Sequence, residues 1–171
     1  EAAPVDAALA LAREAAARLR EAGARDEALA EFVPARRRLG LPFAPRMRPL
    51  GRVWRLGVLL LDAEGGLRAT GRVVRAERPV RKSVTAESVA EHRAYRAAAV
   101  KGGYAEGETV VFDAAPIDAA ALAAGGSSGP LVVQGGRVLV RWSPNQPAAV
   151  ADFASYLRDR VGLLVDPPGG A

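Results

Sequence analysis

The sequence predicts an α+β fold, with a mainly antiparallel sheet of about five strands built from two hairpins and packed by N-terminal, central and C-terminal helices. Three observations predict it. The patterned segments follow the order α, α, ββ, α, β, α, ββ, α, which contains two tight hairpins and lacks regular βαβ alternation. Apolar residues make up 50% of the 171 residues, enough to close one hydrophobic core but not two comfortable ones. Their spacing is helical in some segments and strand-like in others.

We therefore expect a single domain over residues 1–171. Within it, N-terminal helices occupy 1–33, a Pro/Arg-rich arm occupies 34–51, an α+β core occupies 52–165, and residues 166–171 form a frayed tail.

The N-terminal segment is predicted to be helical. From Pro4 to Ala22, apolar residues recur at three- and four-residue spacing, the pattern of an amphipathic helix that ends at Gly23. A second, short helix is expected at Asp26–Val33, where Pro34 stops it.

The arm follows directly. Residues 34–51 contain four prolines and two glycines, which forbid a long regular element and indicate an extended segment. No Asp or Glu occurs between Glu31 and Asp62, but seven arginines do: Arg36, Arg37, Arg38, Arg46, Arg48, Arg52 and Arg55. Such a positive surface attracts nucleic acid, phosphate ligands, an anionic membrane or an acidic protein, and charge alone does not separate them.

Positive charge is distributed unevenly along the chain, which the net charge of +5 does not reveal. Between Phe32 and Lys82 there are thirteen basic residues and three acidic ones. Arginine outnumbers lysine 22 to 2, an excess that codon usage in a GC-rich genome also produces, so the composition by itself is only suggestive. The clustering predicts polyanion binding through six residues: Arg36, Arg37, Arg38, Arg46, Arg48 and Arg52.

The first hairpin is predicted at Arg52–Ala76. Arg52–Leu61 has apolar side chains on both faces, which indicates a central strand. Asp62–Gly66 has turn chemistry, and Leu67–Ala76 forms the return strand. A helix then begins with Thr85 as its N-cap and ends at about Lys101.

The second hairpin is predicted at Leu131–Trp142. It is preceded by a strand at Glu108–Asp113 and a short helix at Pro116–Ala124. Gly135-Gly136 supplies the two positive-φ positions of a type I′ turn between its strands.

The C-terminal helix is expected to begin near Pro147. One stripe of it carries Val150, Phe153, Leu157, Val161 and Leu164.

The composition excludes several chemistries. The absence of cysteine removes disulfides, thiolate nucleophiles, zinc fingers and iron–sulfur ligation, and a lone histidine, His92, rules out multi-histidine metal sites. We expect no metal and no cofactor. The longest apolar run is far too short for a membrane span and no signal-peptide core precedes it, so a cytoplasmic protein without membrane contact is expected.

The candidates for catalysis are Ser127, Ser128 and His92. The segment Gly125–Val133 resembles the Gly-Asp-Ser-Gly-Gly-Pro segment of trypsin-like serine proteases, and His92, Asp113 and the serines follow that family's triad order. However, the intervals are too short and the helix content contradicts a double β-barrel. The segment is therefore interpreted as a flexible Gly/Ser loop that leads into a strand, and His92 as an ordinary helical histidine.

Two Trp-Arg pairs are candidates for ligand binding. Trp54-Arg55 and Arg141-Trp142 lie on strands of different hairpins, so the indoles could line one cleft and the guanidinium groups bind a small anion. The alternation of strand side chains favours the other interpretation, with both tryptophans in the core and both arginines in water.

Most of the chain from Ala35 onward resembles an uncharacterised family of actinobacterial proteins. The resemblance lies in Gly51–Asp62, Ala69–Arg72, Tyr95–Val111, Gly129–Val133 and Val140–Pro144. Some members of that family carry a "glutaminase" label, which implies an amide hydrolase. No Ser-x-x-Lys pair and no cysteine are present to match the known glutaminase nucleophiles.

Three functions follow as hypotheses. The first is a soluble, non-catalytic domain that binds a small anionic ligand or a protein partner and forms a homodimer. It is favoured because no complete catalytic constellation is recognisable. The second is nucleic-acid binding through the segment Pro34–Arg55 and the strand Arg68–Arg75. The third is amide hydrolysis centred on Ser127, Ser128 or His92.

Overall fold

The computed structural model describes residues 2–79 and 87–169. It confirms the α+β class. The chain divides into two compact units, each with its own hydrophobic core. Unit 1 comprises residues 1–26, 53–70 and 114–171, and unit 2 comprises residues 27–52 and 71–113. The expectation that the chain behaves as one domain stays a prediction.

The main sheet has six strands in the hydrogen-bonded order β6-β5-β4-β1-β8-β7, against the expected five or so. It is mixed, because β1 runs parallel to β8 whereas β4 with β5, β5 with β6 and β7 with β8 are antiparallel. A four-stranded sheet and a two-stranded one complete the described strands.

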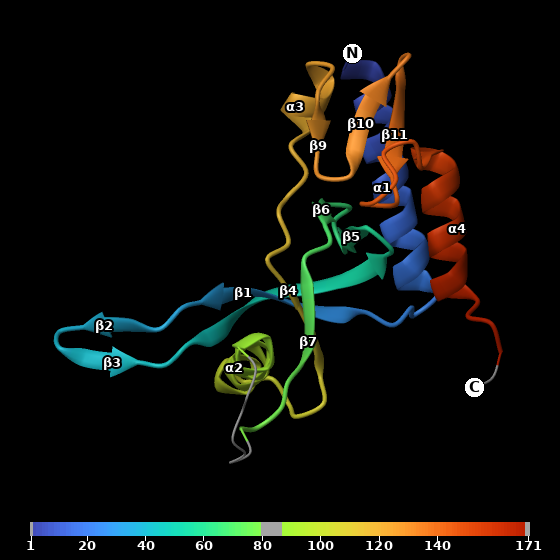
Figure 1. Cartoon of the computed structure of the whole chain (residues 1–171). Helices are drawn as coiled ribbons and strands as arrows, with labels where there is room; N and C mark the ends of the chain where they lie inside the picture. Colours follow the sequence, from blue (N-terminus) through green and yellow to red (C-terminus); the bar gives the residue numbers. More distant parts are fainter. Residues whose placement is uncertain (1, 80–86, 170–171) are drawn as a thin grey trace. The chain divides into compact units, whose positions relative to one another are not determined.

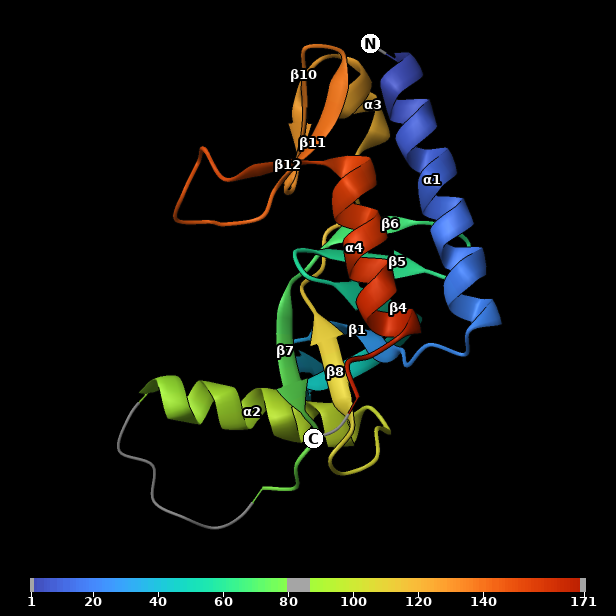
Figure 2. The same cartoon turned by 90° about the vertical axis from the view of Figure 1, so that its right-hand side faces the viewer.

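Helices of unit 1 enclose its core. Helices α1 (Ala2–Glu21) and α4 (Phe153–Val165) lie side by side, as Figure 2 shows, and α3 (Ala119–Ala123) packs on α1. An aspartate caps each of the two later helices: Asp118 accepts a hydrogen bond from the N–H of Ala121, and Asp152 accepts one from the N–H of Ser155.

The strands of unit 1 are short. They are the end of β4 (Arg46–Leu56), β5 (Leu59–Asp62), β6 (Leu67–Ala69), β9 (Ser127–Ser128), β10 (Leu131–Gln134), β11 (Arg137–Arg141) and β12 (Val150–Asp152). The predicted hairpin turns are confirmed. Gly135 and Gly136 have φ values of 55° and 70°, as a type I′ turn requires.

Unit 2 packs helix α2 (Glu87–Lys101) near strands β1 (Glu27–Val33), β7 (Arg72–Arg75), β8 (Thr109–Phe112) and the beginning of β4. Its core includes Met47, Val110 and Phe112, all fully buried. The strands β2 (Arg36–Arg38) and β3 (Leu41–Phe43) pair only with each other, and Figure 1 shows them projecting beyond the ends of β1 and β4.

The helix predicted at Asp26–Val33 is wrong, since this segment forms β1. Ala28 and Leu29 pair with Val110 and Val111 of β8, and three successive residues of the strand are buried. Coverage on both faces by tertiary packing outweighs the weak helical preference of an alanine-rich segment.

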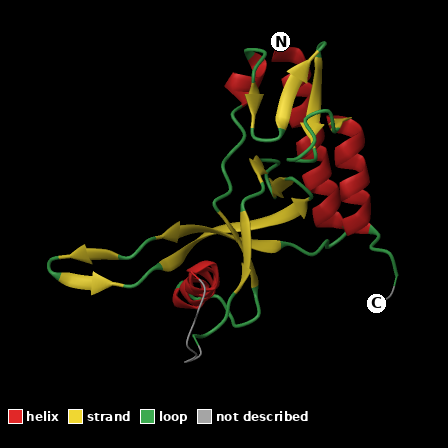
Figure 3. Ribbon diagram, viewed as in Figure 1, coloured by secondary structure: helices red, strands yellow, loops and turns green. Residues whose placement is uncertain are grey.

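The arm is more regular than its prolines suggested. Strands cover much of residues 34–51, and β4 continues through Pro49 (Figure 3). Pro42 is tolerated because the β2–β3 ribbon has only edge strands, which do not require every N–H.

The single strand predicted at Arg52–Leu61 is also wrong. The chain turns back at Gly57, which has a φ of 66°, so β4 and β5 form a hairpin of their own. The return strand Leu67–Ala76 is likewise divided into β6 and β7, which pair with different neighbours.

The strand at residues 108–113 and the short helix at 116–124 are confirmed in outline. The C-terminal helix begins at Phe153 instead of Pro147, because Val150–Asp152 pairs with β11. The Thr85 cap of the central helix and the end of the tail, residues 170 and 171, lie outside the described residues.

Candidate functional site

The arm hairpin, residues 36–43, carries three consecutive exposed arginines, Arg36, Arg37 and Arg38. Its two strands pair Arg36 with Phe43, Arg37 with Pro42 and Arg38 with Leu41. Every residue of the hairpin is exposed. A ribbon of two strands has two accessible faces, so its side chains are available on both sides.

The faces of the arm hairpin differ in chemistry. Because paired residues point to the same side and alternate residues share a face, Arg36, Arg38, Leu41 and Phe43 lie on one face. Arg37 and Pro42 lie on the other. The guanidinium carbon of Arg36 is 6.0 Å from the ring centroid of Phe43, a cation–π contact across the ladder. The first face therefore combines positive charge with exposed apolar surface.

Two of the six arginines predicted to bind polyanions form ion pairs. Arg48 pairs with Glu31, and Arg52 pairs with Glu108 at 3.1 Å. Within the part of the chain that the structure describes, no ion pair involves the remaining four, Arg36, Arg37, Arg38 and Arg46. Arg48 and Arg52 of β4 are thus paired, whereas Arg46 at the start of β4 and the three arginines of the arm hairpin have no ion pair among the described residues.

A hollow of about 310 Å³ lies at the base of the arm hairpin. It is lined by Val33, Pro34, Arg36, Phe43, Ala44, Arg46 and Lys101. Three of these side chains are cations and none is acidic. Lys101, at the end of α2, was not among the residues predicted for this role, since nothing in the sequence relates it to the arm.

In a second group of aromatic and charged residues in unit 2, the polar groups bond to one another. The guanidinium of Arg72 donates to the hydroxyl of Tyr95 at 2.8 Å and lies 4.5 Å from its ring centroid. The Tyr95 hydroxyl in turn donates to Glu91 at 2.9 Å, which is the main reason that the pKa of Tyr95 is raised above 10.0. Arg72 is therefore less available to an anion than the arginines of the arm hairpin.

The two tryptophans have different environments. Trp54 is 6% exposed, and its indole N–H donates to the carbonyl of Ala24 at 3.1 Å, so it belongs to the core of unit 1 as the alternation indicated. Trp142 is 46% exposed, contrary to that interpretation. It lines an open hollow of about 480 Å³ together with Ala151, Ser155, Tyr156, Asp159, Arg160 and Leu163. Trp54, Arg55 and Arg141 are not among the residues that line it.

Neither serine candidate lies in a recognisable catalytic arrangement. The Oγ atom of Ser128 accepts a hydrogen bond from the N–H of Asp118 at 2.8 Å, which fixes the start of α3. Ser127 is exposed on β9. Both serines belong to unit 1, whereas His92 is exposed on α2 in unit 2. No hydrogen bond or ion pair of His92 is found among the described residues.

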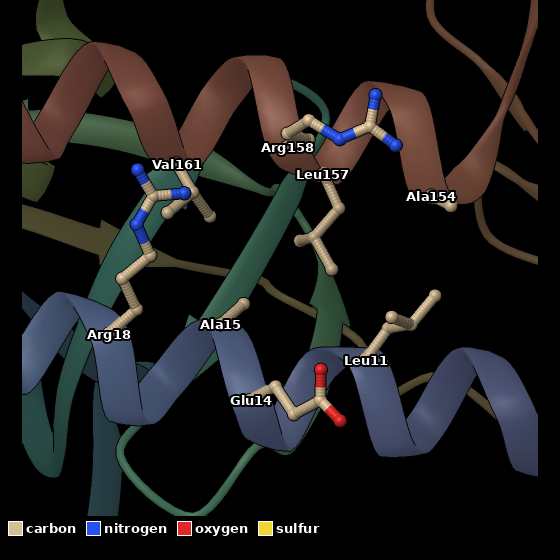
Figure 4. A pocket seen from close by; sticks show the side chains of 8 residues that line it. All are labelled: Leu11, Glu14, Ala15, Arg18, Ala154, Leu157, Arg158 and Val161. Carbon is tan, nitrogen blue, oxygen red and sulfur yellow. The ribbon is translucent and has the colours of Figure 1, made fainter.

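A groove of about 210 Å³ runs between the neighbouring helices α1 and α4 (Figure 4). Its walls are Leu11, Glu14, Ala15 and Arg18 of α1 and Ala154, Leu157, Arg158 and Val161 of α4. Figure 4 shows Leu11 and Leu157 extending toward each other, with charged groups of both signs at the rim.

Over residues 2–79 and 87–169, no three His, Cys, Asp or Glu side chains gather in a way that could hold a metal ion. None of the helices found there is both long and apolar enough to cross a membrane.

No protein-family model, curated protein sequence or solved structure matches this chain. The resemblance to the actinobacterial family stays a prediction.

Proposed function

We propose that this protein binds nucleic acid and that the arm hairpin is its main binding element. The proposal narrows the broader expectation of a non-catalytic binding domain. The observation that carries it is the set of four exposed arginines, Arg36, Arg37, Arg38 and Arg46, for which the described residues supply no carboxylate.

Charge favours a polyanion. No Asp or Glu occurs between Glu31 and Asp62, so no acidic side chain of the hairpin itself offsets its field. Lys101 adds a further cation at the base of the arm hairpin. Clustered arginines attract phosphates over a distance of about 8 Å at physiological ionic strength and form bidentate hydrogen bonds on contact.

Shape favours nucleic acid over a flat anionic surface. Arg37 lies on the face of the ribbon opposite to Arg36 and Arg38. A membrane offers phosphates on one side of such a ribbon, whereas a nucleic-acid groove has phosphates along both walls. The major groove of B-form DNA is about 12 Å wide and admits a two-stranded ribbon.

The test is fluorescence anisotropy with a labelled 20-base-pair duplex, measured over a series of salt concentrations. Replacing Arg36, Arg37 and Arg38 by Gln should weaken binding and reduce the slope of log K against log [salt] by up to about 2.7, because each phosphate contact contributes roughly 0.9. The arginines are exposed, so the fold should be unaffected.

The matched control replaces three other exposed arginines, Arg13, Arg25 and Arg93, by Gln. It removes the same charge but should leave the slope nearly unchanged. Equal losses in both triple variants would show that binding depends on net charge and not on the arm hairpin. Absent or salt-insensitive binding of the unmodified protein would contradict the proposal altogether.

A further inference from the structure

The tip of the arm hairpin has an unusual residue for its backbone conformation. Leu39 and Gly40 are the two residues between the paired positions Arg38 and Leu41. Their φ values are 51° and 77°, so both are left-handed. Asparagine, aspartate and glycine suit the first of these positions, whereas a leucine there is disfavoured by contact between its Cβ and the backbone.

No packing of the Leu39 side chain offsets the cost of its left-handed backbone conformation. Leu39 is 96% exposed, more than any other large apolar side chain among the described residues. Leu41 and Phe43, on the face that also bears Arg36 and Arg38, are 63% and 47% exposed. Neither the turn nor a core accounts for a leucine at the tip, and a residue held in a disfavoured conformation without packing suggests a role in binding.

We propose that Leu39 is an apolar wedge that inserts between neighbouring bases of duplex DNA. This inference rests on the proposed function of the arm hairpin. Arg37 and Arg38, which form no ion pair among the described residues, immediately precede the tip, and their guanidinium groups would hold the phosphates beside the opened step. Apolar side chains inserted in this way unstack a base step and kink the duplex.

Duplex DNA fits this arrangement better than duplex RNA. The deep, narrow major groove of A-form RNA does not admit a ribbon, whereas the groove of B-form DNA does. The cost of unstacking is lowest where a base is missing or unpaired. The wedge therefore predicts a preference for duplex DNA with a gap or bulge over intact duplex of the same sequence and length.

The test compares dissociation constants for an intact 20-base-pair duplex and for the same duplex with a one-nucleotide gap, with bending followed by energy transfer between labelled ends. We expect the unmodified protein to prefer the gapped duplex by at least about tenfold, since unstacking a step costs a few kcal/mol. Replacing Leu39 by Asn should abolish this preference and the bend. Because asparagine suits the turn, this variant should keep the arm hairpin folded.

Two further variants test whether the effect depends on an apolar side chain at the tip. Leu39→Met keeps an apolar tip and should keep the preference. Leu163→Gln removes another exposed leucine, on α4, and should change neither the preference nor the bend.

If Leu39→Asn retains the gapped-duplex preference and the salt slope, the wedge is refuted while nucleic-acid binding by the arm hairpin stands. If Leu39→Asn instead changes only the oligomeric state measured by light scattering, the tip docks on a second copy of the chain and the wedge is again refuted. If the unmodified protein binds neither duplex, the proposed function fails first.

Discussion

The hydroxyl of Tyr156 donates a hydrogen bond to the carbonyl of Leu56 at 2.9 Å, although the two residues are 100 positions apart. The same hydroxyl accepts a hydrogen bond from the N–H of Val58 at 2.9 Å. One side chain of α4 thus bonds to the backbone groups on both sides of Gly57, in the turn between β4 and β5. Its ring is buried in the core of unit 1.

Replacing Tyr156 by Phe should lower the free energy of unfolding by about 1–3 kcal/mol, because it removes the hydroxyl that donates to the Leu56 carbonyl and accepts from the Val58 N–H. Urea unfolding followed by circular dichroism measures this. The same change at Tyr104, whose hydroxyl makes one long contact of 3.4 Å with the carbonyl of Leu29, should have a clearly smaller effect. Equal losses in the two variants would mean that the Tyr156 hydroxyl adds nothing special to the turn.

The same turn makes Gly57 intolerant of a side chain. Gly57 has a φ of 66°, and a methyl group there would collide with the hydroxyl of Tyr156. Gly57→Ala should therefore destabilise the protein by more than about 1 kcal/mol. Gly162, in the last turn of α4, has open space around it, so Gly162→Ala should stabilise by about 0.5–1 kcal/mol. Thermal unfolding of the two variants should give shifts of opposite sign, and shifts of the same sign would contradict this account of the turn.

Asp152 makes stability dependent on pH at the acid end. Its carboxylate accepts hydrogen bonds from Arg137 at 2.7 Å and from the N–H of Ser155 at 3.3 Å. The contact with Arg137 is the main reason that the pKa of Asp152 is lowered from 3.8. A carboxyl group whose pKa is lower in the folded state contributes stability above its unfolded pKa, and that contribution is lost as the pH falls through the folded pKa.

Asp152→Asn keeps a good N-cap residue but removes the charge. We expect it to cost about 0.2–1 kcal/mol at pH 7, since the ion pair is partly solvent-exposed, and clearly less at pH 2. Urea midpoints measured at both pH values provide the comparison. A loss at pH 2 as large as that at pH 7 would assign the effect to capping or packing instead of charge.

The two indoles should be distinguishable by fluorescence. In a Trp142→Phe variant only the buried Trp54 emits, so the spectrum should be blue-shifted and resistant to iodide quenching. In a Trp54→Phe variant the remaining Trp142 should emit at longer wavelength and be readily quenched. Similar quenching of both variants would show that the environments of the two side chains do not differ.

Local chemistry made several elements predictable. Gly135-Gly136 specifies its own turn, and the amphipathic pattern of the first 22 residues specifies α1. By contrast, β1 acquires its conformation from pairing with β8, and nothing within Asp26–Val33 reveals that partner. Trp142 was misplaced because alternation was extended one residue too far: β11 ends at Arg141, and beyond the strand the period of two no longer applies.

The candidate site was half predictable for the same reason. The cluster of arginines is visible in the sequence, but which of them are neutralised depends on Glu31 and Glu108, and Glu108 lies far along the chain from the arm. The apolar tip is not predictable from the sequence, because Leu-Gly is not a typical hairpin dipeptide.

The division of the chain into two units has a genetic consequence. The backbone passes from one unit to the other after Asp26, Arg52, Thr70 and Asp113, so unit 1 is assembled from three pieces of sequence and unit 2 from two. No single cut in the gene releases either core intact. Neither unit can be inherited, exchanged by recombination or expressed as an uninterrupted fragment, and a shortened version of this protein that ends before Asp113 lacks residues of both units.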